Sequence, residues 1–472
     1  MTASDIAAEV ARAEAAIEAG DYDAAHAAIE AVVASHPRDS GAHNVLGFLA
    51  YREGRLIDAQ REFELACALP GAGDDARANL ELVRGELAAV YAASGGGAPA
   101  PAAAAPAPSS ELDFGGTYEE LHRGAWGPDV SPLLLGRLLA APVDAELEAR
   151  LDQLVTATTM NERRFLLRFA AHFWDGRGDV FENGPLLGGT TRALALGMLA
   201  NGRRDPGALL QTHDWFTTTV PLDLPQGTWE KMVSEGQISR GELEAMNESG
   251  SFKAVFDSLH SGWDYSPLVR SHVAYLPDFP GDEPKRGEAI FEAPDRVFSL
   301  VFVDGCKSWY GTKHWILRMC DRVPRGSHFV FQDYGWYTCF WLPTLIGSLP
   351  DHFRLVAHVD DTYAFELLRE LDVAMIESRF PDDPADLGRD GFDDIFLRLG
   401  VDAGTRSDVR SMVALTIQHA GALAYIGHKG EARDYIAAMR TRPEFARFRS
   451  RFIDPALHSP TYGPDGPIRL DD

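Results

Sequence analysis

The sequence predicts an all-α N-terminal domain followed by an α/β domain in which helices cover both faces of a mostly parallel sheet. Three observations lead to this fold class. The first 94 residues are rich in Ala and Glu at helical spacing, residues 95–110 contain only Gly, Ala, Pro and Ser, and from Glu111 apolar strand-like runs alternate with helical segments. Such alternation is typical of a parallel sheet, because each parallel connection needs a crossover, usually a helix.

Two segments of the first 94 residues match each other at an offset of 34 residues, and each closes with a proline. The matching pairs are Gly20 with Gly54 and Ala25 with Ala59, and the prolines are Pro37 and Pro70. This period and these small residues resemble tetratricopeptide repeats, in which paired helices pack closely. The resemblance implies a surface for a protein or peptide partner. An ordinary Ala-rich helical hairpin is the alternative.

Composition divides the chain into four parts. Residues 1–94 form the repeat-like domain, 95–110 form an Ala/Pro/Gly linker that cannot bury enough surface to fold, and 111–380 form the α/β domain. After about Pro381 the pattern returns to helices, so 381–472 is predicted as a helical extension. Within it, Ser411–Thr441 is expected to form a helical hairpin.

Six apolar runs of the α/β domain are predicted as strands. They are Asp179–Glu182, Ala208–His213, His272–Leu276, Phe298–Asp304, His328–Gln332 and Phe353–His358. Between the second and third strands lies a long connection with helical character over Thr228–Ser261. A connection of this length in a compact domain is long enough to cover a site as a lid.

The segment after the first predicted strand is rich in glycine. The strand ends in Glu182, a turn containing Gly184, Gly188 and Gly189 follows, and a helix begins near Thr190. Glycines let the backbone come close to a ligand, and a helix start offers free N–H groups to the ligand's polar atoms. This arrangement favours a nucleotide-type ligand.

A second acid, Asp214, follows the next predicted strand, thirty residues beyond Gly184. A carboxylate at this place can accept hydrogen bonds from both hydroxyls of a ribose. The pairing of the glycine-rich turn with Asp214 therefore indicates an adenosyl ligand. A tight strand-to-helix connection with no ligand is the alternative.

These residues resemble the first motif of the class I S-adenosylmethionine-dependent methyltransferases, an acid followed by Gly-x-x-x-Gly-Gly-Ser/Thr-Thr, with a further acid ending the second strand. The resemblance implies a Rossmann-like methyltransferase domain with S-adenosylmethionine as cofactor. It implies that Glu182 and Gly184 lie near the methionine portion. It further places Gly188, Gly189 and Thr190 near the methionine backbone and Asp214 on the ribose.

Two more predicted strands end in acids, Asp304 and Asp333. Because the carboxyl ends of parallel strands meet at one edge of a sheet, both acids should face the same crevice as Glu182 and Asp214. Their spacing resembles a subgroup of sugar and small-molecule O-methyltransferases related to cephalosporin hydroxylase-like proteins. In that subgroup the two strand-end acids bind Mg²⁺ and a nearby histidine serves as base.

The chain departs from that subgroup at two positions, since Cys306 stands where an acid is common and Lys307 where the histidine is common. Nearby carboxylates raise the pKa of a lysine, so Lys307 is expected to pair with an acid or to hold an anionic substrate. The predicted base is Asp304 or Asp333. Two alternatives stay open: a Mg²⁺ ion on these acids, with a third ligand from Gln332 or water, and His314 as a replacement imidazole.

Aromatic residues are concentrated around these two acids. They are Trp309, Tyr310, Trp315, Tyr334, Trp336, Tyr337, Phe340 and Trp341. Each alone is most simply a core residue, but loops that follow strand ends line pockets in such sheets. A saccharide or aromatic acceptor would stack well there.

Charge and composition restrict the partners. Asp and Glu number 70 against 44 Lys and Arg, a net charge of −26 that disfavours nucleic acids and anionic membrane surfaces. No apolar run is long enough to span a membrane, and the first residues do not resemble a secretory signal. Four cysteines without a CxxC pair suggest free thiols, so a cytoplasmic location is expected.

The sequence therefore predicts an S-adenosylmethionine-dependent methyltransferase that transfers a methyl group to an oxygen of a saccharide or small metabolite. Asp304, Asp333 and Lys307 are the expected catalytic residues, and a repeat domain binds a protein partner. Two alternatives remain. One is a non-catalytic interaction scaffold with a degenerate methyltransferase domain, and the other is a metal-dependent hydroxylase-like enzyme on the same fold.

Overall fold

The computed structural model describes residues 3–19, 40–52, 75–83, 145–154, 156–218, 227–284, 287–405 and 408–470, with single positions between 24 and 73. The chain divides into two compact units, one made of residues 1–111, 397–413 and 442–447 and the other of the remaining residues. The predicted linker 95–110 lies outside the described residues. Each unit is described by itself.

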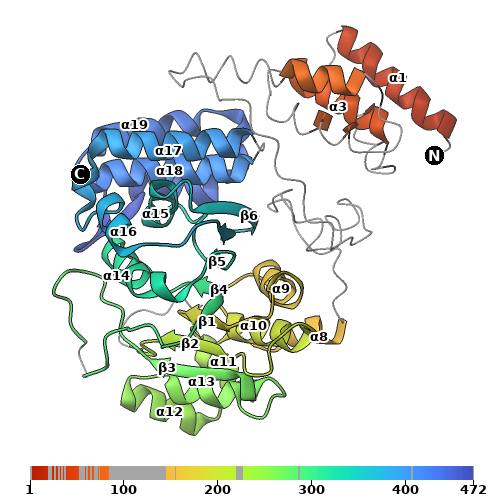
Figure 1. The fold of residues 1–472 in the computed structure, drawn as a ribbon. Helices are drawn as coiled ribbons and strands as arrows, with labels where there is room; N and C mark the ends of the chain where they lie inside the picture. The colour runs from red at the N-terminus through yellow and green to blue at the C-terminus, as the bar shows by residue number, and fades with distance from the viewer. Residues whose placement is uncertain are drawn as a thin grey trace. The chain divides into compact units, whose positions relative to one another are not determined.

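The N-terminal unit contains α1 (Ala3–Ala19) and α3 (Ser40–Arg52), drawn in red and orange in Figure 1. Ala25 and Ala59, the pair predicted from the 34-residue offset, are both fully buried. Gly47 lies so close to the Phe63 ring that a Cβ at this position would come within 2.7 Å of it. Small residues thus let these helices approach closely, and assignment to tetratricopeptide repeats stays a prediction.

The second unit is built on a seven-stranded sheet (Figure 1). Its strands, in spatial order, are β3 (Val269–Val273), β2 (Leu210–Asp214), β1 (Asp179–Asn183), β4 (Phe298–Val303), β5 (His328–Phe331), β7 (Thr362–Leu367) and β6 (Phe353–Val359). The first five are parallel, and β7 is antiparallel to both of its neighbours. The chain order reverses between β1 and β4, which is where ligands bind in doubly wound sheets.

The predicted mostly parallel sheet is confirmed, with two differences. The strand predicted at His272–Leu276 begins three residues earlier, at Val269, and β7 was not predicted at all. β3 is an edge strand whose residues are half-buried or exposed, so its apolar pattern is weak. β7 follows β6 through the tight turn at Asp360 and Asp361.

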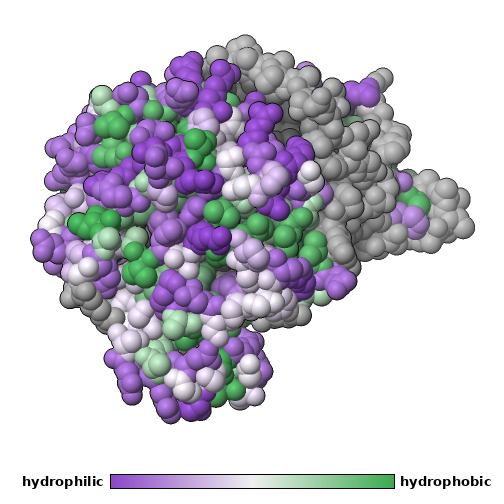
Figure 2. Space-filling model, turned by 60° about the horizontal axis from the view of Figure 1, so that its bottom comes forward, coloured by the Kyte–Doolittle hydropathy of each residue, from purple (hydrophilic) through white to green (hydrophobic). Residues whose placement is uncertain are grey.

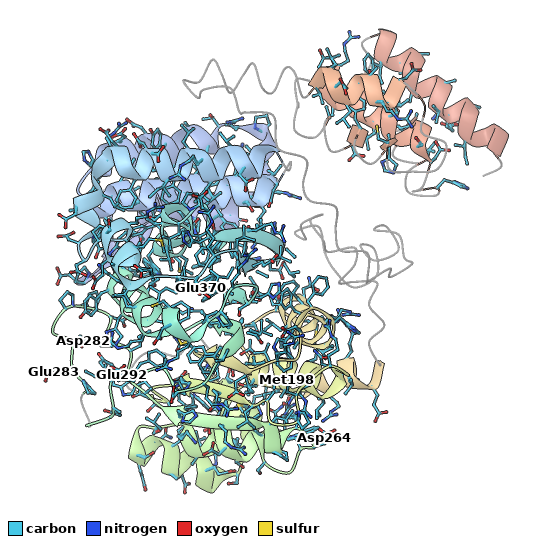
Figure 3. All side chains as sticks on the ribbon, in the orientation of Figure 1. Met198, Asp264, Asp282, Glu283, Glu292 and Glu370 are labelled. Carbon is cyan, nitrogen blue, oxygen red and sulfur yellow. The ribbon has the colours of Figure 1, made fainter. Side chains whose placement is uncertain are left out.

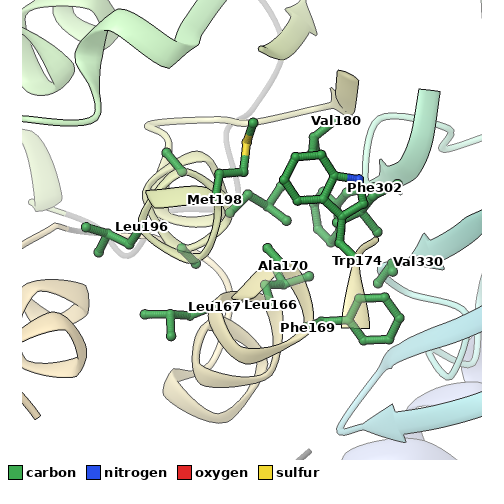
Figure 4. Packing of buried hydrophobic residues seen from close by; sticks show 14 of the residues in the cluster. Leu166, Leu167, Phe169, Ala170, Trp174, Val180, Leu196, Met198, Phe302 and Val330 are labelled. Atoms are coloured by element: carbon green, nitrogen blue, oxygen red, sulfur yellow. The ribbon is translucent and has the colours of Figure 1, made fainter. Parts of the chain in front are cut away.

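One face of the sheet is covered by α9 (Met160–Arg168) and α10 (Gly189–Ala200). Figure 4 shows Trp174, Phe302 and Val330 converging on Met198 of α10 and Phe169 at the end of α9. Every residue of β1 and β4 is buried, as expected of central parallel strands covered on both faces.

The other face is covered by α14 (Trp309–Met319). Its Trp315 is fully buried with its ring against Phe329 and Phe331, which alternate with Val330 along β5 and so point to the opposite side. Helices on both faces are therefore confirmed. α15 (Trp341–Ser348) follows β5 and is entirely buried.

The long connection between β2 and β3 is helical, as predicted, and lies next to β3 in Figure 1. It forms α11 (Thr228–Ser234), α12 (Arg240–Ser249) and α13 (Lys253–His260). These helices share an apolar cluster with Leu187, and half-buried Leu186 packs against that cluster. They therefore pack on the glycine-rich turn after β1.

The remaining elements lie mostly after the sheet. They are α8 (Ala145–Ala149), α16 (Val373–Arg379), α17 (Gly388–Thr405), α18 (Val409–Tyr425), α19 (Lys429–Arg440), α20 (Asp454–His458) and the hairpin of β8 (Thr461–Gly463) and β9 (Gly466–Ile468). Short 3₁₀ or π segments cover Arg150–Gln153, Phe169–Phe173, Ser266–Leu268, Cys320–Arg322, Pro384–Leu387, Pro443–Phe448 and Arg449–Ile453. α18 and α19 fall within the predicted hairpin at Ser411–Thr441 and its immediate flanks.

The surface shown in Figure 2 mixes hydrophilic residues with small hydrophobic groups across the described part of the chain. No helix among the described residues combines the length and the apolar composition needed to cross a membrane.

Candidate functional site

Glu182, at the end of β1, is completely enclosed. Its two carboxylate oxygens each accept a 2.6 Å hydrogen bond, one from the Thr190 hydroxyl and one from the Thr191 hydroxyl at the start of α10. Burial raises the pKa of Glu182 to about 7, against the opposing effect of these hydroxyls. The side chain therefore ties the strand to the helix, and Thr190 uses its hydroxyl for the same purpose.

Gly184 has a left-handed backbone, with φ of 81°. A Cβ at this position would lie 2.6 Å from the backbone nitrogen of Gly305, just after β4. Only glycine fits both the backbone angle and this contact. Gly184 therefore lets the ends of β1 and β4 approach each other at the point where the sheet order reverses.

The space beside Gly188 and Gly189 is filled by the chain itself. A Cβ on Gly188 would lie 1.8 Å from Nε2 of His260, and one on Gly189 would lie 2.4 Å from Oγ1 of Thr156. His260 is held by the Leu187 carbonyl at 3.2 Å and the Tyr265 hydroxyl at 3.1 Å. Close packing thus accounts for these two glycines, and their contact with a ligand stays a prediction.

Asp214, at the end of β2, is half-buried. Its Oδ1 accepts a 2.5 Å hydrogen bond from the backbone N–H of Phe216, and the N–H groups of Leu186 and Trp215 also favour its charged form. Burial nevertheless raises the pKa of Asp214 to about 6. A carboxylate offers about four acceptor positions, so three N–H groups leave room for a ligand hydroxyl.

Asp304 and Asp333 follow β4 and β5, and Lys307 lies between them. Nζ of Lys307 is 2.6 Å from Oδ1 of Asp304 and 2.5 Å from Oδ2 of Asp333. The lysine side chain is 49% exposed and the two aspartates 20% and 24% exposed, so the group is open to solvent. Burial alone would lower the pKa of Lys307, but the two carboxylates raise it well above its ordinary value.

The four acids predicted to share one edge of the sheet are brought together there. The charge of Asp304 raises the pKa of both Glu182 and Asp214, although in each case burial is the larger cause. Lys307 pairs with acids, as the sequence predicts. Glu182 differs from the other three acids, because it is sealed inside the protein and has no exposed oxygen for a ligand.

The predicted magnesium site is not supported. In the described part of the chain, no three His, Cys, Asp or Glu side chains come together as ligands. Lys307 occupies the position between the two carboxylates, and Gln332 points elsewhere, with its amide donating to Glu162 at 3.1 Å. The residues present do not fit a divalent ion.

Two further residues were considered from the sequence: Cys306, which stands where an acid is common, and His314, the alternative imidazole. Burial raises the pKa of the Cys306 thiol, against the opposing effects of the Lys307 charge and of a 3.6 Å hydrogen bond that the Asn183 amide donates to the sulfur. His314 lines a cavity of about 480 Å³ between the β3–β4 connection and α14. Acidic residues from that connection also line it, and Figure 3 labels Asp282, Glu283 and Glu292 there.

Most of the aromatic residues that were predicted to contact the methyl acceptor are core residues. Those that are buried are Trp309, Trp315, Tyr334, Phe340 and Trp341. Trp309, for example, stacks on Phe380 with ring centroids 3.9 Å apart. Tyr310, Trp336 and Tyr337 are half-buried and so remain partly accessible.

One polar network next to the site was not predicted from the sequence. Glu162 is buried beneath the end of β5, where it accepts hydrogen bonds from Gln332 and from the Thr362 hydroxyl at 2.9 Å. Its other oxygen accepts from the backbone N–H of Thr159, which completes a capping box at the start of α9. The Thr-x-x-Glu spacing of Thr159 and Glu162 was the available signal.

Two solved methyltransferase structures are similar to part of this chain. No family model matches the chain, and no curated protein matches it. Among solved structures, the O-methyltransferase NovP is similar with 15% identity and a TM-score of 0.30, over 45% of this chain and 84% of that one. The calicheamicin methyltransferase CalS11 is similar with 14% identity and a TM-score of 0.29, over 49% and 89% of the two chains.

Proposed function

We propose that the chain is an S-adenosylmethionine-dependent methyltransferase that methylates an oxygen of a saccharide or small metabolite. The observation that carries this proposal is the grouping of Asp214, Asp304 and Asp333 at the carboxyl edge of parallel strands, on both sides of the point where strand order reverses. Ligands of doubly wound sheets bind at this place. The sequence motif around Gly184 resembles the corresponding motif of class I methyltransferases.

The residues present fit two parts of the cofactor, its ribose and its positively charged sulfonium group. Asp214 is partly accessible and keeps acceptor capacity for a ribose hydroxyl. Asp304 and Asp333 outweigh the single charge of Lys307, so the local excess of negative charge favours a cationic sulfonium group. When bound, S-adenosylmethionine supplies an electrophilic methyl group.

The chain's own residues would align and deprotonate the acceptor. An acceptor hydroxyl at the exposed edge of Asp304 or Asp333 donates its hydrogen bond to that carboxylate, which takes the proton. Lys307 holds both carboxylates in place and orients the acceptor oxygen. Because the methyl transfer itself is an in-line displacement, alignment supplies most of the rate. The half-buried rings of Trp336 and Tyr337 are the proposed contacts for the acceptor.

The N-terminal unit is proposed to bind a protein or peptide partner. The proposal is supported by the close approach of its helices, as in Gly47 against Phe63, which the predicted repeat requires.

A second candidate is the non-catalytic scaffold. It is favoured by one observation, the filling of the space beside Gly188 and Gly189 by His260 and Thr156. A turn packed in this way is explained without a ligand. In a scaffold, the N-terminal unit would carry the function and the sheet would serve only as its support.

Calorimetric titration of S-adenosylmethionine and its demethylated product decides between the two. We expect binding to the wild-type chain and at least about a tenfold weaker binding to Asp214→Asn, because a lost hydrogen bond to a charged group costs about 1.5–3 kcal/mol. Asp205→Asn is the matched control, since Asp205 is exposed at the opposite end of β2. Absence of binding to a folded wild-type chain would favour the scaffold.

A further inference from the structure

The carboxylates of Asp304 and Asp333 are adjacent because the strands before them are paired. β4 and β5 are parallel with Val303 opposite Phe331, so both chains leave the sheet at the same level. One side-chain nitrogen, Nζ of Lys307, contacts a carboxylate oxygen of each acid. Two carboxylates this close repel each other unless a positive charge lies between them.

The position of the ammonium is set by the backbone around it. On one side of Lys307, the Cys306 carbonyl accepts a 3.0 Å hydrogen bond from the buried Trp341 indole. On the other side, the Ser308 hydroxyl caps α14 by accepting from the Gly311 N–H at 2.9 Å. Lys307 is therefore anchored at both neighbours, and its ammonium does not depend on a freely moving loop.

Asp333 is fixed in a similar way. It has a left-handed backbone with φ of 62°, a conformation that non-glycine residues adopt only where the surroundings demand it. The Trp336 N–H donates to its carbonyl at 3.0 Å, and the Gly335 N–H donates to the Asp361 carbonyl at 3.1 Å. Strained, well-supported backbone of this kind is concentrated at functional sites.

We propose that Lys307 is the resident cation of this site and takes the place that a divalent metal ion would need between Asp304 and Asp333. The site then works without a metal. Two N–H groups of the ammonium are used by the two carboxylates, and the third is left to donate to the acceptor oxygen. This last step rests on the proposed methyltransferase function, whereas the replacement of a metal does not.

The charge of the group also restricts the acceptor. One ammonium between two carboxylates leaves the group negative, with Asp214 close by. A phosphate or carboxylate beside Lys307 would meet this excess charge, so the third N–H suits a neutral hydroxyl. The acceptor class is therefore an uncharged polyol or phenol.

Titration with Mn²⁺, followed by calorimetry or electron paramagnetic resonance, tests the metal replacement without cofactor or substrate. The wild-type chain is expected to bind Mn²⁺ only weakly. Lys307→Met removes the ammonium and keeps the length of the side chain, so Asp304 and Asp333 face an ion that prefers oxygen ligands without a positive charge between them. We expect its affinity for Mn²⁺ to rise by at least about a hundredfold, from Coulomb's law at these separations.

Three variants make the result specific. Lys307→Arg keeps the charge and should bind Mn²⁺ as weakly as the wild type. Lys307→Met with Asp333→Asn should lose the gained affinity. Lys313→Met is the control, because Lys313 pairs with Asp382 at 2.7 Å, away from Asp304 and Asp333 in the sequence.

Tight Mn²⁺ binding by the wild-type chain would overturn the proposal, whatever the variants do. A folded Lys307→Met chain without gained affinity would also overturn it. If that variant does not fold, Lys307→Gln replaces it, and folding is followed by circular dichroism. Failure of S-adenosylmethionine to bind would remove the proposed function and leave the Mn²⁺ result standing. Once turnover is observed, a chelator should leave it unchanged.

Discussion

Gln332 and Asp333 are adjacent in the chain, yet their side chains belong to separate groups. The Gln332 amide donates to Glu162 at 3.1 Å, whereas the Asp333 carboxylate contacts Lys307 at 2.5 Å. Both residues lie in the turn that follows β5, and Asp333 has a left-handed backbone there. The end of one strand therefore supports two polar groups, one buried and one open to solvent.

The buried group makes stability depend on pH. Burial, and next the charge of Asp361, raises the pKa of Glu162 to about 7. Because this pKa lies above that of the unfolded chain, the folded protein binds more protons between about pH 4.5 and 7, and its stability falls as the pH rises through this range. The loss amounts to roughly 3 kcal/mol.

Glu162→Gln should remove most of this dependence, since glutamine resembles the protonated acid and keeps the capping box. Urea denaturation at pH 5 and pH 8 measures the effect. We expect the variant to lose less stability than the wild type between the two values. Glu182 has a similarly raised pKa and is present in both chains, so some dependence of the unfolding free energy on pH should remain in the variant. Equal slopes in the two chains would contradict the prediction.

The strand ends and their acids could be predicted from the sequence because they depend on local patterns. β4 is apolar except for Ser299 and is followed directly by Asp304, and the short strand β1 carries Glu182 next to its last residue, Asn183. β7 could not be predicted in this way. Its hairpin turn has Asp360 in a left-handed conformation, with φ of 51°, where glycine or asparagine would have been the usual signal.

The contacts made by the site residues depend on distant parts of the chain. From the sequence, Gly188 is predicted to contact a ligand. In the structure it packs against the His260 ring, which belongs to α13, the third helix of the long connection. Gln332 looks like a metal ligand, but Thr362 and Glu162 surround its amide. No local sequence pattern predicts these contacts, because they form only when distant parts of the chain pack together.

Gln418 of α18 supports the loop after Asp333. It is fully buried, and its amide nitrogen donates to the carbonyls of Tyr334 at 2.7 Å and Trp336 at 2.9 Å. Gln418→Met keeps the size but removes both donors, so the unfolding free energy should fall by about 2 kcal/mol. Hydrogen exchange at the Trp336 amide should become faster. Gln237→Met is the control, and an unchanged exchange rate in Gln418→Met would argue against this support.

Asp179 should stabilise the fold with the opposite dependence on pH. Burial alone would raise its pKa, but hydrogen bonds from Arg296 and Gln211 lower it below the usual value. The stabilisation is therefore present above the pKa of the unfolded chain and is lost as the pH falls through the folded value. At neutral pH, Asp179→Asn should lower the unfolding free energy by about 2 kcal/mol. Near pH 3 the unfolding free energies of the wild type and the variant should differ less. A larger difference at pH 3 would contradict this role of Asp179.

Gly188→Ala tests how tightly the glycine-rich turn is packed. The backbone of Gly188 is left-handed, with φ of 85°, and an added Cβ would meet the His260 ring, which is itself fixed by Leu187 and Tyr265. The strain of the backbone and the overlap together should lower the unfolding free energy by about 2–4 kcal/mol. Gly202→Ala is the matched control, because a Cβ there meets no atom within 4 Å, and its effect should stay within about 0.5 kcal/mol. A stable Gly188→Ala chain would mean that His260 moves aside easily, and the space beside the turn would then be available to a ligand.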